Sequence, residues 1–342
     1  MKKRCVLRGV VDGYSSYSLH LFRVAEGLYK LGREIAILPV RTERGKAPIP
    51  GLISESIVGK RQLEDWEMLI HCPTCPIDNK RKIVYNTMWE TTRLHKQSIL
   101  ALNQAALVVV PSTFNLGTFN AQGVKRPMVK VPLGIDTSVF SYKAPLKKDV
   151  YVFGTAGRTA AGGCRKGLQD VIDGFVKAFP KRVKDVRLLV KCHPDDPEVD
   201  IKDDRIQFVR EFWTRKQLAN WYKAIDCFVS ASKGEGWGLH QHEAMATGRS
   251  VIAVPFGGIT EFYDEGVGYP VDFKLKPSES HYDNGGLWAV PEMDSLVDRM
   301  REVYNVRRSD KELKASERGM KLDWDNSNRL LEKQLINAGF YK

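Results

Sequence analysis

The sequence predicts an α/β protein made of two doubly wound domains, and two observations support this prediction. Apolar segments of strand length alternate with segments of helical periodicity along nearly the whole chain. This order favours parallel sheets covered by helices. The chain of 342 residues is also longer than a single compact domain usually is. Two domains of this class are therefore expected.

The first half opens with a strand over 4–11, a helix over 18–32 and a strand over 34–40. The apolar residues in the helix recur with helical spacing, whereas the two flanking segments are short and rich in Val, Ile and Leu. Further strands are expected over 68–72, 82–88, 107–112 and 128–136, with a helix over 93–105.

The second half repeats this alternation. Strands are expected over 150–157, 186–192, 205–209, 227–232, 250–256 and 268–273. Helices are expected over 167–179, 215–225, 240–246, 293–306 and 326–340. Between the halves, "SYKAPLKK" at 141–148 loses the apolar periodicity and contains Pro and Lys, as linkers often do.

We therefore predict a Rossmann-like N-terminal domain over 1–145 and a Rossmann-like C-terminal domain over 146–325. A last helix, within 326–342, is expected to pack back on the N-terminal domain. Ligands of doubly wound sheets bind beyond the carboxyl ends of the strands. Two such domains facing each other would leave a cleft between them.

The composition of the chain indicates the cellular compartment of the protein. No segment approaches the ~20 apolar residues needed to cross a bilayer, and Arg8 interrupts the first apolar segment, which favours a strand over a signal peptide. Three of the six cysteines, Cys5, Cys192 and Cys227, lie in strand-like segments, where reduced thiols pack as small hydrophobes. We expect a cytoplasmic protein, either free or peripherally bound at the inner face of the membrane.

The spacing in "HCPTC", which contains His71, Cys72 and Cys75, is that of half a zinc site or of a redox pair. The chain has no second cysteine pair to complete a metal site. Metal or redox chemistry is therefore the less favoured interpretation of this segment.

Positive charge is concentrated in the first half. The net charge is +12, and residues 1–145 contain 21 Lys and Arg against 11 Asp and Glu. A solvated surface explains this balance, and so does an anionic partner such as a phospholipid head group, a phosphorylated saccharide or nucleic acid. The oligomeric state is not indicated.

The stretch "GEGWGLHQHEAMATG" at 234–248 carries the densest group of functional side chains. His240 and His242 are two residues apart, which places them on different faces of a helix, whereas helical zinc ligands are usually four apart. Glu235 on the turn and Glu243 within the helix would contact two parts of one extended ligand. Carboxylates only accept hydrogen bonds, so sugar hydroxyls are natural partners.

A glycine-rich turn before a helix also suits a phosphate group. The amides of Gly238, Leu239 and His240 would be free of helical partners near the positive end of the helix dipole. His240 itself would contact the bound molecule or cap the turn.

The surroundings resemble the GT-B-fold, nucleotide-sugar-dependent glycosyltransferases of family 4, which carry an E-x7-E motif like that from Glu235 to Glu243. The resemblance covers nearly the whole chain. Its other parts are "RKQLANWYKAIDCFVSASKGEGWG", "PFGGITEFYDEGVGYPV", "MWETTRLHKQSILALNQAALVVVPSTFNLGTFNAQGV" and "VPLGIDTSVF". It implies the GT-B architecture and transfer of a hexosyl group with retention of configuration and without a metal or other cofactor.

Several roles follow from the resemblance. Glu243 would hold the nucleotide ribose, and Glu235 would contact the donor sugar. Arg158 and Lys166 resemble the Arg and Lys that neutralise the diphosphate, where cations stabilise the charge that develops on the leaving group. The neighbouring Arg165 fits a solvated position better than these two do.

The base would lie near Phe212, by stacking or through backbone groups. Gly13 resembles the family's glycine loop, although a plain turn also explains it. His71 lies where relatives carry a histidine facing the reacting sugar, but a buried structural histidine is an equal alternative. Glu90 and Thr91 would lie near the cleft, with Trp89 as a packing residue.

The acceptor is expected to be a glycan, a glycolipid or a polysaccharide precursor. A nucleic-acid acceptor is the first alternative, because the basic half is the acceptor half in this fold, although no nucleic-acid module is recognised. The second alternative is a protein that binds sugar nucleotides or polyanions without catalysis. Same-face attack assisted by the leaving phosphate is preferred to a covalent intermediate.

Overall fold

The structure, a computed structural model, describes residues 4–13, 15–42, 49–58, 67–71, 82–144, 148–158, 163–196, 201–279 and 285–340. Cys72 and Cys75 of the "HCPTC" segment lie outside these residues. The chain divides into two compact units. Unit 1 comprises Met1–Trp89, Arg93–Gly134 and Leu322–Lys342, and unit 2 comprises Glu90–Thr92 and Ile135–Lys321.

These bounds differ from the domains expected over 1–145, 146–325 and 326–342. The chain enters unit 2 at Ile135 rather than after residue 145, because Phe140 is fully buried against Tyr222, with ring centroids 6.0 Å apart. It re-enters unit 1 at Leu322, just before Trp324, which is buried there.

Unit 1 is built on a parallel sheet of order β2-β1-β3-β4-β5-β6. Its strands are β1 (Arg4–Val11), β2 (Glu34–Thr42), β3 (Glu67–Ile70), β4 (Ile83–Asn86), β5 (Leu107–Val110) and β6 (Met128–Lys130). The order reverses between β1 and β3, so that the carboxyl ends of these two strands form the switch point of the sheet, where ligands of such folds bind.

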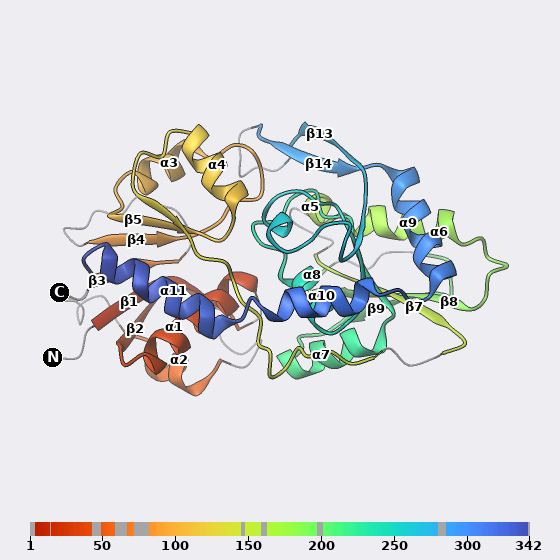
Figure 1. Cartoon of the computed structure of the whole chain (residues 1–342), viewed down its shortest axis with the longest axis horizontal. Helices are drawn as coiled ribbons and strands as arrows, with labels where there is room; N and C mark the ends of the chain where they lie inside the picture. The colour runs from red at the N-terminus through yellow and green to blue at the C-terminus, as the bar shows by residue number, and fades with distance from the viewer. Residues whose placement is uncertain are drawn as a thin grey trace. The chain divides into compact units, whose positions relative to one another are not determined.

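The helices of unit 1 are α1 (Ser16–Lys30), α2 (Gly51–Glu55), α3 (Lys96–Leu102), α4 (Thr113–Ala121) and α11 (Trp324–Asn337). One apolar cluster joins residues of α1 to Leu331 and Leu335 of α11, and a second joins residues of α3 and α4. The C-terminal helix therefore packs in unit 1 beside α1 (Figure 1). Gly27 permits this approach, because a Cβ there would lie 2.0 Å from the Asn328 side chain.

Unit 2 is built on a parallel sheet of order β12-β11-β10-β7-β8-β9, which is the Rossmann order. Its strands are β7 (Tyr151–Ala156), β8 (Val186–Cys192), β9 (Ile206–Arg210), β10 (Cys227–Ser230), β11 (Ser250–Ala253) and β12 (Tyr269–Pro270). Here the switch point lies between β7 and β10. An antiparallel pair, β13 (Phe273–Pro277) and β14 (Leu287–Pro291), was not expected.

The helices of unit 2 are α5 (Gly163–Lys166), α6 (Leu168–Ala178), α7 (Arg215–Ala224), α8 (Leu239–Ala246), the 3₁₀ helix η2 (Gly258–Glu261), α9 (Met293–Val306) and α10 (Lys311–Met320). Helix α7 begins with a capping box between Thr214 and Gln217. Buried Arg205 pairs with Asp203 and donates to the backbone carbonyls of Phe179, Pro180 and Val183 after α6. Both sheets are thus covered by helices, as the alternation of the sequence predicted.

Candidate active site

The turn that carries Glu235 follows β10, at the switch point of the unit 2 sheet. The amide of Gly258 donates to the Glu235 carbonyl over 2.7 Å, and Gly257 forms a bridge with the same residue. A Cβ on Gly257 would lie 2.4 Å from the Glu235 carbonyl oxygen, and the φ of Gly257 is +86°. Only glycine at 257 therefore allows the loop that contains Gly257 and Gly258 to pack against the turn that carries Glu235.

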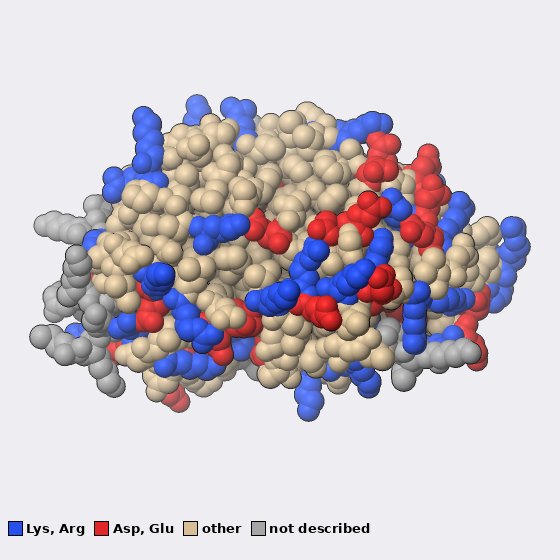
Figure 2. Space-filling model, in the orientation of Figure 1, with Lys and Arg blue, Asp and Glu red and all other residues tan. Residues whose placement is uncertain are grey.

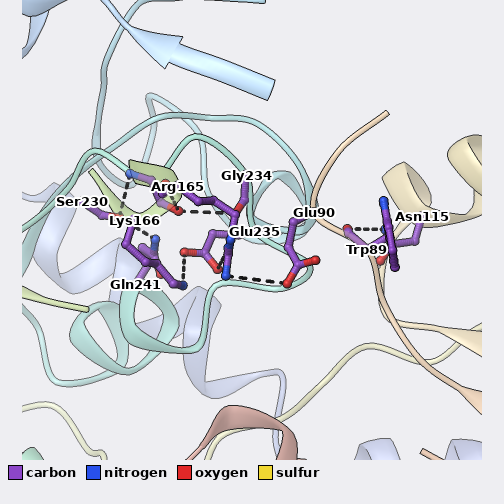
Figure 3. Close-up of polar contacts among 10 residues, drawn as sticks. Trp89, Glu90, Asn115, Arg165, Lys166, Ser230, Gly234, Glu235 and Gln241 are labelled. Carbon is purple, nitrogen blue, oxygen red and sulfur yellow. Dashed lines mark hydrogen bonds and ion pairs between the residues drawn. The ribbon is translucent and has the colours of Figure 1, made fainter. Parts of the chain in front are cut away.

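The Glu235 carboxylate lies against two cations. Its Oε1 accepts a hydrogen bond from Lys166 Nζ over 2.6 Å, and its Oε2 lies 3.8 Å from Arg165 (Figure 3). Burial would raise the pKa of Glu235, but Lys166 and Arg165 outweigh it and lower this pKa to about 2. Burial lowers the pKa of Lys166, against the opposing effect of Glu235. The cluster thus holds two cations in a largely buried position.

Arg165 is part of this cluster rather than a solvated neighbour. Its guanidinium donates to the Gly234 carbonyl over 2.6 Å and lies 3.7 Å from the Glu90 carboxylate (Figure 3). The backbone also ties α5 to the turn, because the Lys233 amide donates to the Arg165 carbonyl over 2.7 Å. Glu90 therefore does lie beside the site residues of unit 2.

Arg158 follows β7, on the other side of the switch point. Its Nε donates to Asp196 over 3.2 Å, and its side chain is 46% exposed. The Asp196 carboxylate also accepts from the amide of His193. Arg158 is thus oriented by a buried carboxylate and remains accessible to a ligand.

Helix α8 is present where the sequence predicted a helix, but it begins at Leu239, one residue earlier than expected. Gly238 precedes it with a φ of +97°, and the first helical hydrogen bond runs from the His242 amide to the Gly238 carbonyl. The amides of Leu239 and His240 therefore lie in the first turn, where helical amides have no partner within the helix and favour an anion.

Glu243 is almost completely enclosed, with a side chain 1% exposed. It forms an ion pair with Arg215 and accepts a hydrogen bond from the Tyr222 hydroxyl over 3.2 Å. Burial and the nearby Glu243 charge raise the pKa of Tyr222 well above its usual value. Arg215 and Tyr222 were not among the residues predicted for the site, although their spacing of seven places both on the same face of α7.

The two histidines of α8 have separate surroundings. His240 Nδ1 lies 2.8 Å from the Tyr222 hydroxyl. His242 is fully buried, accepts from Trp237 Nε1 over 3.2 Å and lies 2.9 Å from the Gly319 carbonyl through Nε2. His242 therefore joins α8 to α10, whereas His240 belongs to the group around Glu243.

Phe212 lies just beyond β9. Its ring packs edge-on against that of His193, with centroids 5.0 Å apart, and its side chain is half-buried. Nearby, Lys191 donates to the Glu211 carbonyl over 3.0 Å. This aromatic edge lies at the carboxyl ends of β8 and β9.

The candidates of unit 1 also lie at a switch point, beyond β1 and β3. Gly13 has a φ of +77°, and its amide donates to the Ser18 hydroxyl at the start of α1. His71 is buried, with Nδ1 3.3 Å from the Asn86 carbonyl and its ring centroid 4.1 Å from that of His20. Burial, and then the neighbouring His20, lower the pKa of His71 well below its usual value. His71 is therefore neutral at pH 7.

The remaining residues expected near the site are Thr91 and Trp89. Thr91 is buried in unit 2. Trp89 belongs to unit 1, where its indole nitrogen donates to the Arg93 carbonyl over 2.6 Å and its backbone carbonyl accepts from the Asn115 amide.

Two doubly wound parallel sheets, with charged and polar side chains gathered at their switch points, define the class of protein: the GT-B fold. Sucrose-phosphate synthase from Thermosynechococcus elongatus has this architecture, with a TM-score of 0.74, 16% identity and coverage of 99% of this chain and 100% of that one. HepE from Anabaena, in complex with UDP and glucose, gives a TM-score of 0.68 at 14% identity over 98% of this chain and 100% of its own.

Sequence comparison gives a more particular result for unit 2. Residues 151–305, which lie within unit 2, match the family described as "Glycosyl transferases group 1". The chain is also 30% identical over 178 residues to LpsB, a lipopolysaccharide core biosynthesis mannosyltransferase of Rhizobium meliloti. That match covers 47% of this chain and 46% of LpsB, so the chain spans about half the length of this relative.

Proposed function

We propose that the protein is a glycosyltransferase that moves a hexosyl group from a nucleotide-diphosphate sugar to an acceptor hydroxyl. One observation carries the proposal: Glu235 and Glu243 flank one glycine turn at a switch point, and each is paired with cationic side chains. The group 1 domain over 151–305 and the GT-B fold support it. So does the resemblance to family 4 and its E-x7-E motif.

The proposed roles follow the surroundings of each side chain. Glu243 accepts hydrogen bonds from the ribose hydroxyls, and the first amides of α8 face a phosphate. Glu235 accepts from hydroxyls of the donor sugar. When the sugar engages Glu235, Lys166 and Arg165 become available to the diphosphate. Arg158 adds a further cation, and Phe212 contacts the base. Gly13 and His71 lie at the switch point of the unit 1 sheet.

The proposed reaction retains the configuration of the sugar. The bond from the anomeric carbon to the diphosphate breaks, the acceptor oxygen bonds to the same face, and its proton passes to the leaving phosphate. Lys166, Arg165 and Arg158 stabilise the charge that develops on that phosphate, and we propose that no metal is required. Undiminished turnover in EDTA tests metal independence, and an unchanged anomeric configuration in the product tests retention. A glycosyl adduct trapped on a side chain would contradict direct same-face attack, because a covalent intermediate also gives retention.

We further propose that the acceptor is a glycolipid or glycan precursor, in line with the name of LpsB, and that the protein acts in the cytoplasm. Residues 93–134 of unit 1 contain five Lys and Arg and no Asp or Glu. Figure 2 shows blue side chains around the edge of this part of unit 1, next to a largely uncharged face, and Leu100 of α3 is exposed. Such a surface suits an anionic lipid head group. Among the described residues, no helix is both long enough and apolar enough to cross a membrane.

A nucleotide panel tests the proposal. Thermal unfolding would be followed with UDP, GDP and ADP, and hydrolysis would be measured with UDP-glucose, GDP-mannose and ADP-glucose. We expect one nucleotide to raise the unfolding temperature and the matching sugar nucleotide to be hydrolysed slowly. Stabilisation without hydrolysis or transfer would favour a binding protein, and no response to any nucleotide would refute the proposal.

The basic surface requires a separate measurement. Sedimentation with vesicles containing an anionic phospholipid, compared with vesicles of neutral lipid, should show binding that weakens with salt. The charge-removing variant Lys96→Gln, Lys125→Gln, Arg126→Gln should lose that binding. A salt-sensitive shift of DNA or RNA, without vesicle binding, would instead favour the nucleic-acid alternative.

A further inference from the structure

A short chain of hydrogen bonds links α7 to α8. The hydroxyl of Tyr222 lies 2.8 Å from Nδ1 of His240 and donates to Oε2 of Glu243 over 3.2 Å. The other carboxylate oxygen of Glu243 is paired with Arg215. Tyr222 and Glu243 are both almost fully buried, so the hydrogen bond between them is shielded from solvent.

The number of protons that these side chains carry fixes the donor and the acceptor of each hydrogen bond. A phenol has one proton to donate, and an ionised carboxylate can only accept. The Arg215 guanidinium favours the ionised form of Glu243, so the Tyr222 proton lies between the phenol and this carboxylate. Nδ1 of His240 must then donate to the phenol oxygen. In the opposite arrangement the phenol oxygen and the carboxylate oxygen would lie 3.2 Å apart with no proton between them, and such a contact between two buried acceptors is unfavourable.

The protonation state of His240 agrees with this order. Burial, and then the charges of Lys166 and Lys191, lower the pKa of His240 to about 3. The ring is therefore neutral at pH 7 and carries a single N–H group. If that proton is on Nδ1, Nε2 is a hydrogen-bond acceptor.

We propose that Tyr222 is a positioning residue that holds His240 as the Nδ1–H tautomer, and that Nε2 of His240 accepts a hydrogen bond from a hydroxyl group of the nucleotide sugar. The His240 side chain is 32% exposed, at the first turn of α8. An unprotonated phosphate oxygen has no proton to offer Nε2, whereas the ribose and the hexose carry several hydroxyl groups. The hydroxyl contact rests on the proposed function; the tautomer does not.

The tautomer is measurable on the free protein. In histidine-selective ¹⁵N spectra, with His240 assigned from the spectrum of His240→Leu, we expect the wild type to show a protonated Nδ1 and an unprotonated Nε2. Tyr222→Phe should lose this preference. Tyr263→Phe is the matched control, because Tyr263 is also buried but its hydroxyl bonds backbone groups of Val251 and Ala253 and not a histidine. A protonated Nε2 in the wild type would overturn the proposal.

The hydroxyl contact is tested by calorimetry. UDP, GDP and ADP would be compared with their 2′-deoxy and 3′-deoxy forms, which lack ribose hydroxyls. UDP-glucose and GDP-mannose would be compared with their deoxyhexose analogues, which lack hexose hydroxyls. For the ligand that binds, we expect His240→Leu to raise Kd about three- to tenfold, as for one lost hydrogen bond. The analogue that lacks the contacted hydroxyl should bind wild type and variant equally, which identifies the ribose or the hexose.

An equal loss of affinity for every analogue would overturn the hydroxyl contact while leaving nucleotide binding intact. Failure of the wild type to bind any of the compounds would refute the proposed function and the contact together. The spectra would still decide the tautomer in that case, so the two failures are distinguishable.

Discussion

Glu235 and Glu243 lie on the two sides of one glycine turn, yet the structure holds them differently. Glu235 lies on the turn itself, where Lys166 and Arg165 reach it from α5. Glu243 lies within α8, where Arg215 and Tyr222 reach it from α7. The cations at Glu235 are also suited to a diphosphate, so a ligand can exchange with that carboxylate. Glu243 instead has its own partners and offers a fixed acceptor.

The largest expected effect distinguishes the two carboxylates by catalysis. Glu235→Gln should lower kcat by about 10²–10³-fold, the size of effect seen when one group that stabilises a transition state is removed. Steady-state transfer or donor hydrolysis measures it. Glu265→Gln, an exposed carboxylate of the same unit, is the control. A kcat within twofold of wild type would remove Glu235 from the reaction.

The second effect concerns binding. Glu243→Gln should raise the Kd of the bound nucleoside diphosphate about 10- to 100-fold, because the ribose loses an ionised acceptor and Arg215 loses its counter-charge. Glu312→Gln serves as the control, since Glu312 is also buried but bonds Ser250 and Ser309 away from the site residues. Equal losses in both variants would mean that the Glu243 effect is one of stability alone.

The third effect concerns the pH dependence of stability that His242 causes. Burial lowers the pKa of His242 to about 4, below the unfolded value of about 6.5. The stability that the neutral ring contributes is therefore complete above pH 6.5 and is lost as the pH falls through about 4. Between pH 7 and 4.5 the loss is about 2 kcal/mol.

Urea unfolding of the wild type and of His242→Asn at these two pH values checks this sign. The variant is less stable at pH 7, but its stability should fall about 2 kcal/mol less on acidification. Parallel falls in both proteins would show that His242 does not titrate with unfolding. Donor affinity at pH 7 should be unchanged in the variant.

The smallest effect concerns the exposed cation. Arg158→Met should raise the Kd for the nucleoside diphosphate only about two- to fivefold, because a side chain that is 46% exposed interacts through a screened field. Calorimetry at low and high salt checks this, and the difference from wild type should shrink with salt. A larger, salt-independent loss would indicate that Arg158 becomes enclosed around the ligand.

Much of the fold follows from local patterns, and the departures have physical causes. The apolar strands and the amphipathic helices α1, α6, α7 and α9 were predicted because each buries a periodic face. Helix α10 was not, because it buries small and polar residues, Ala315, Ser316 and Gly319, against α8. The pair β13–β14 was missed because Lys and Pro interrupt its first strand.

The boundary near Gly134 could not be inferred from the local sequence. A Cβ at Gly134 would lie 2.2 Å from the backbone of Asp323, a residue far along the chain. Only the folded chain shows why glycine is needed there.

The site residues also fall into two groups, those recognisable from the sequence and those whose roles depend on the fold. Glu235, Glu243, Lys166 and the turn glycines were recognisable because they lie close together in a motif or resemble a family. The roles of Arg165, Arg215 and Tyr222 depend on which helices flank the turn, and that is decided by the sheet order. The pairing of Arg165 with Glu90 joins residues from separate parts of the chain.

The proposed difference between Glu235 and Glu243 is tested most directly by the affinity of the nucleoside diphosphate, without its sugar, for Glu235→Gln and Glu243→Gln. Calorimetry of Glu235→Gln should give a Kd equal to or lower than that of wild type, because Lys166 and Arg165 are released from a competing carboxylate. Glu243→Gln should give a higher Kd. Equal weakening in both variants, or weakening in Glu235→Gln alone, would contradict the account.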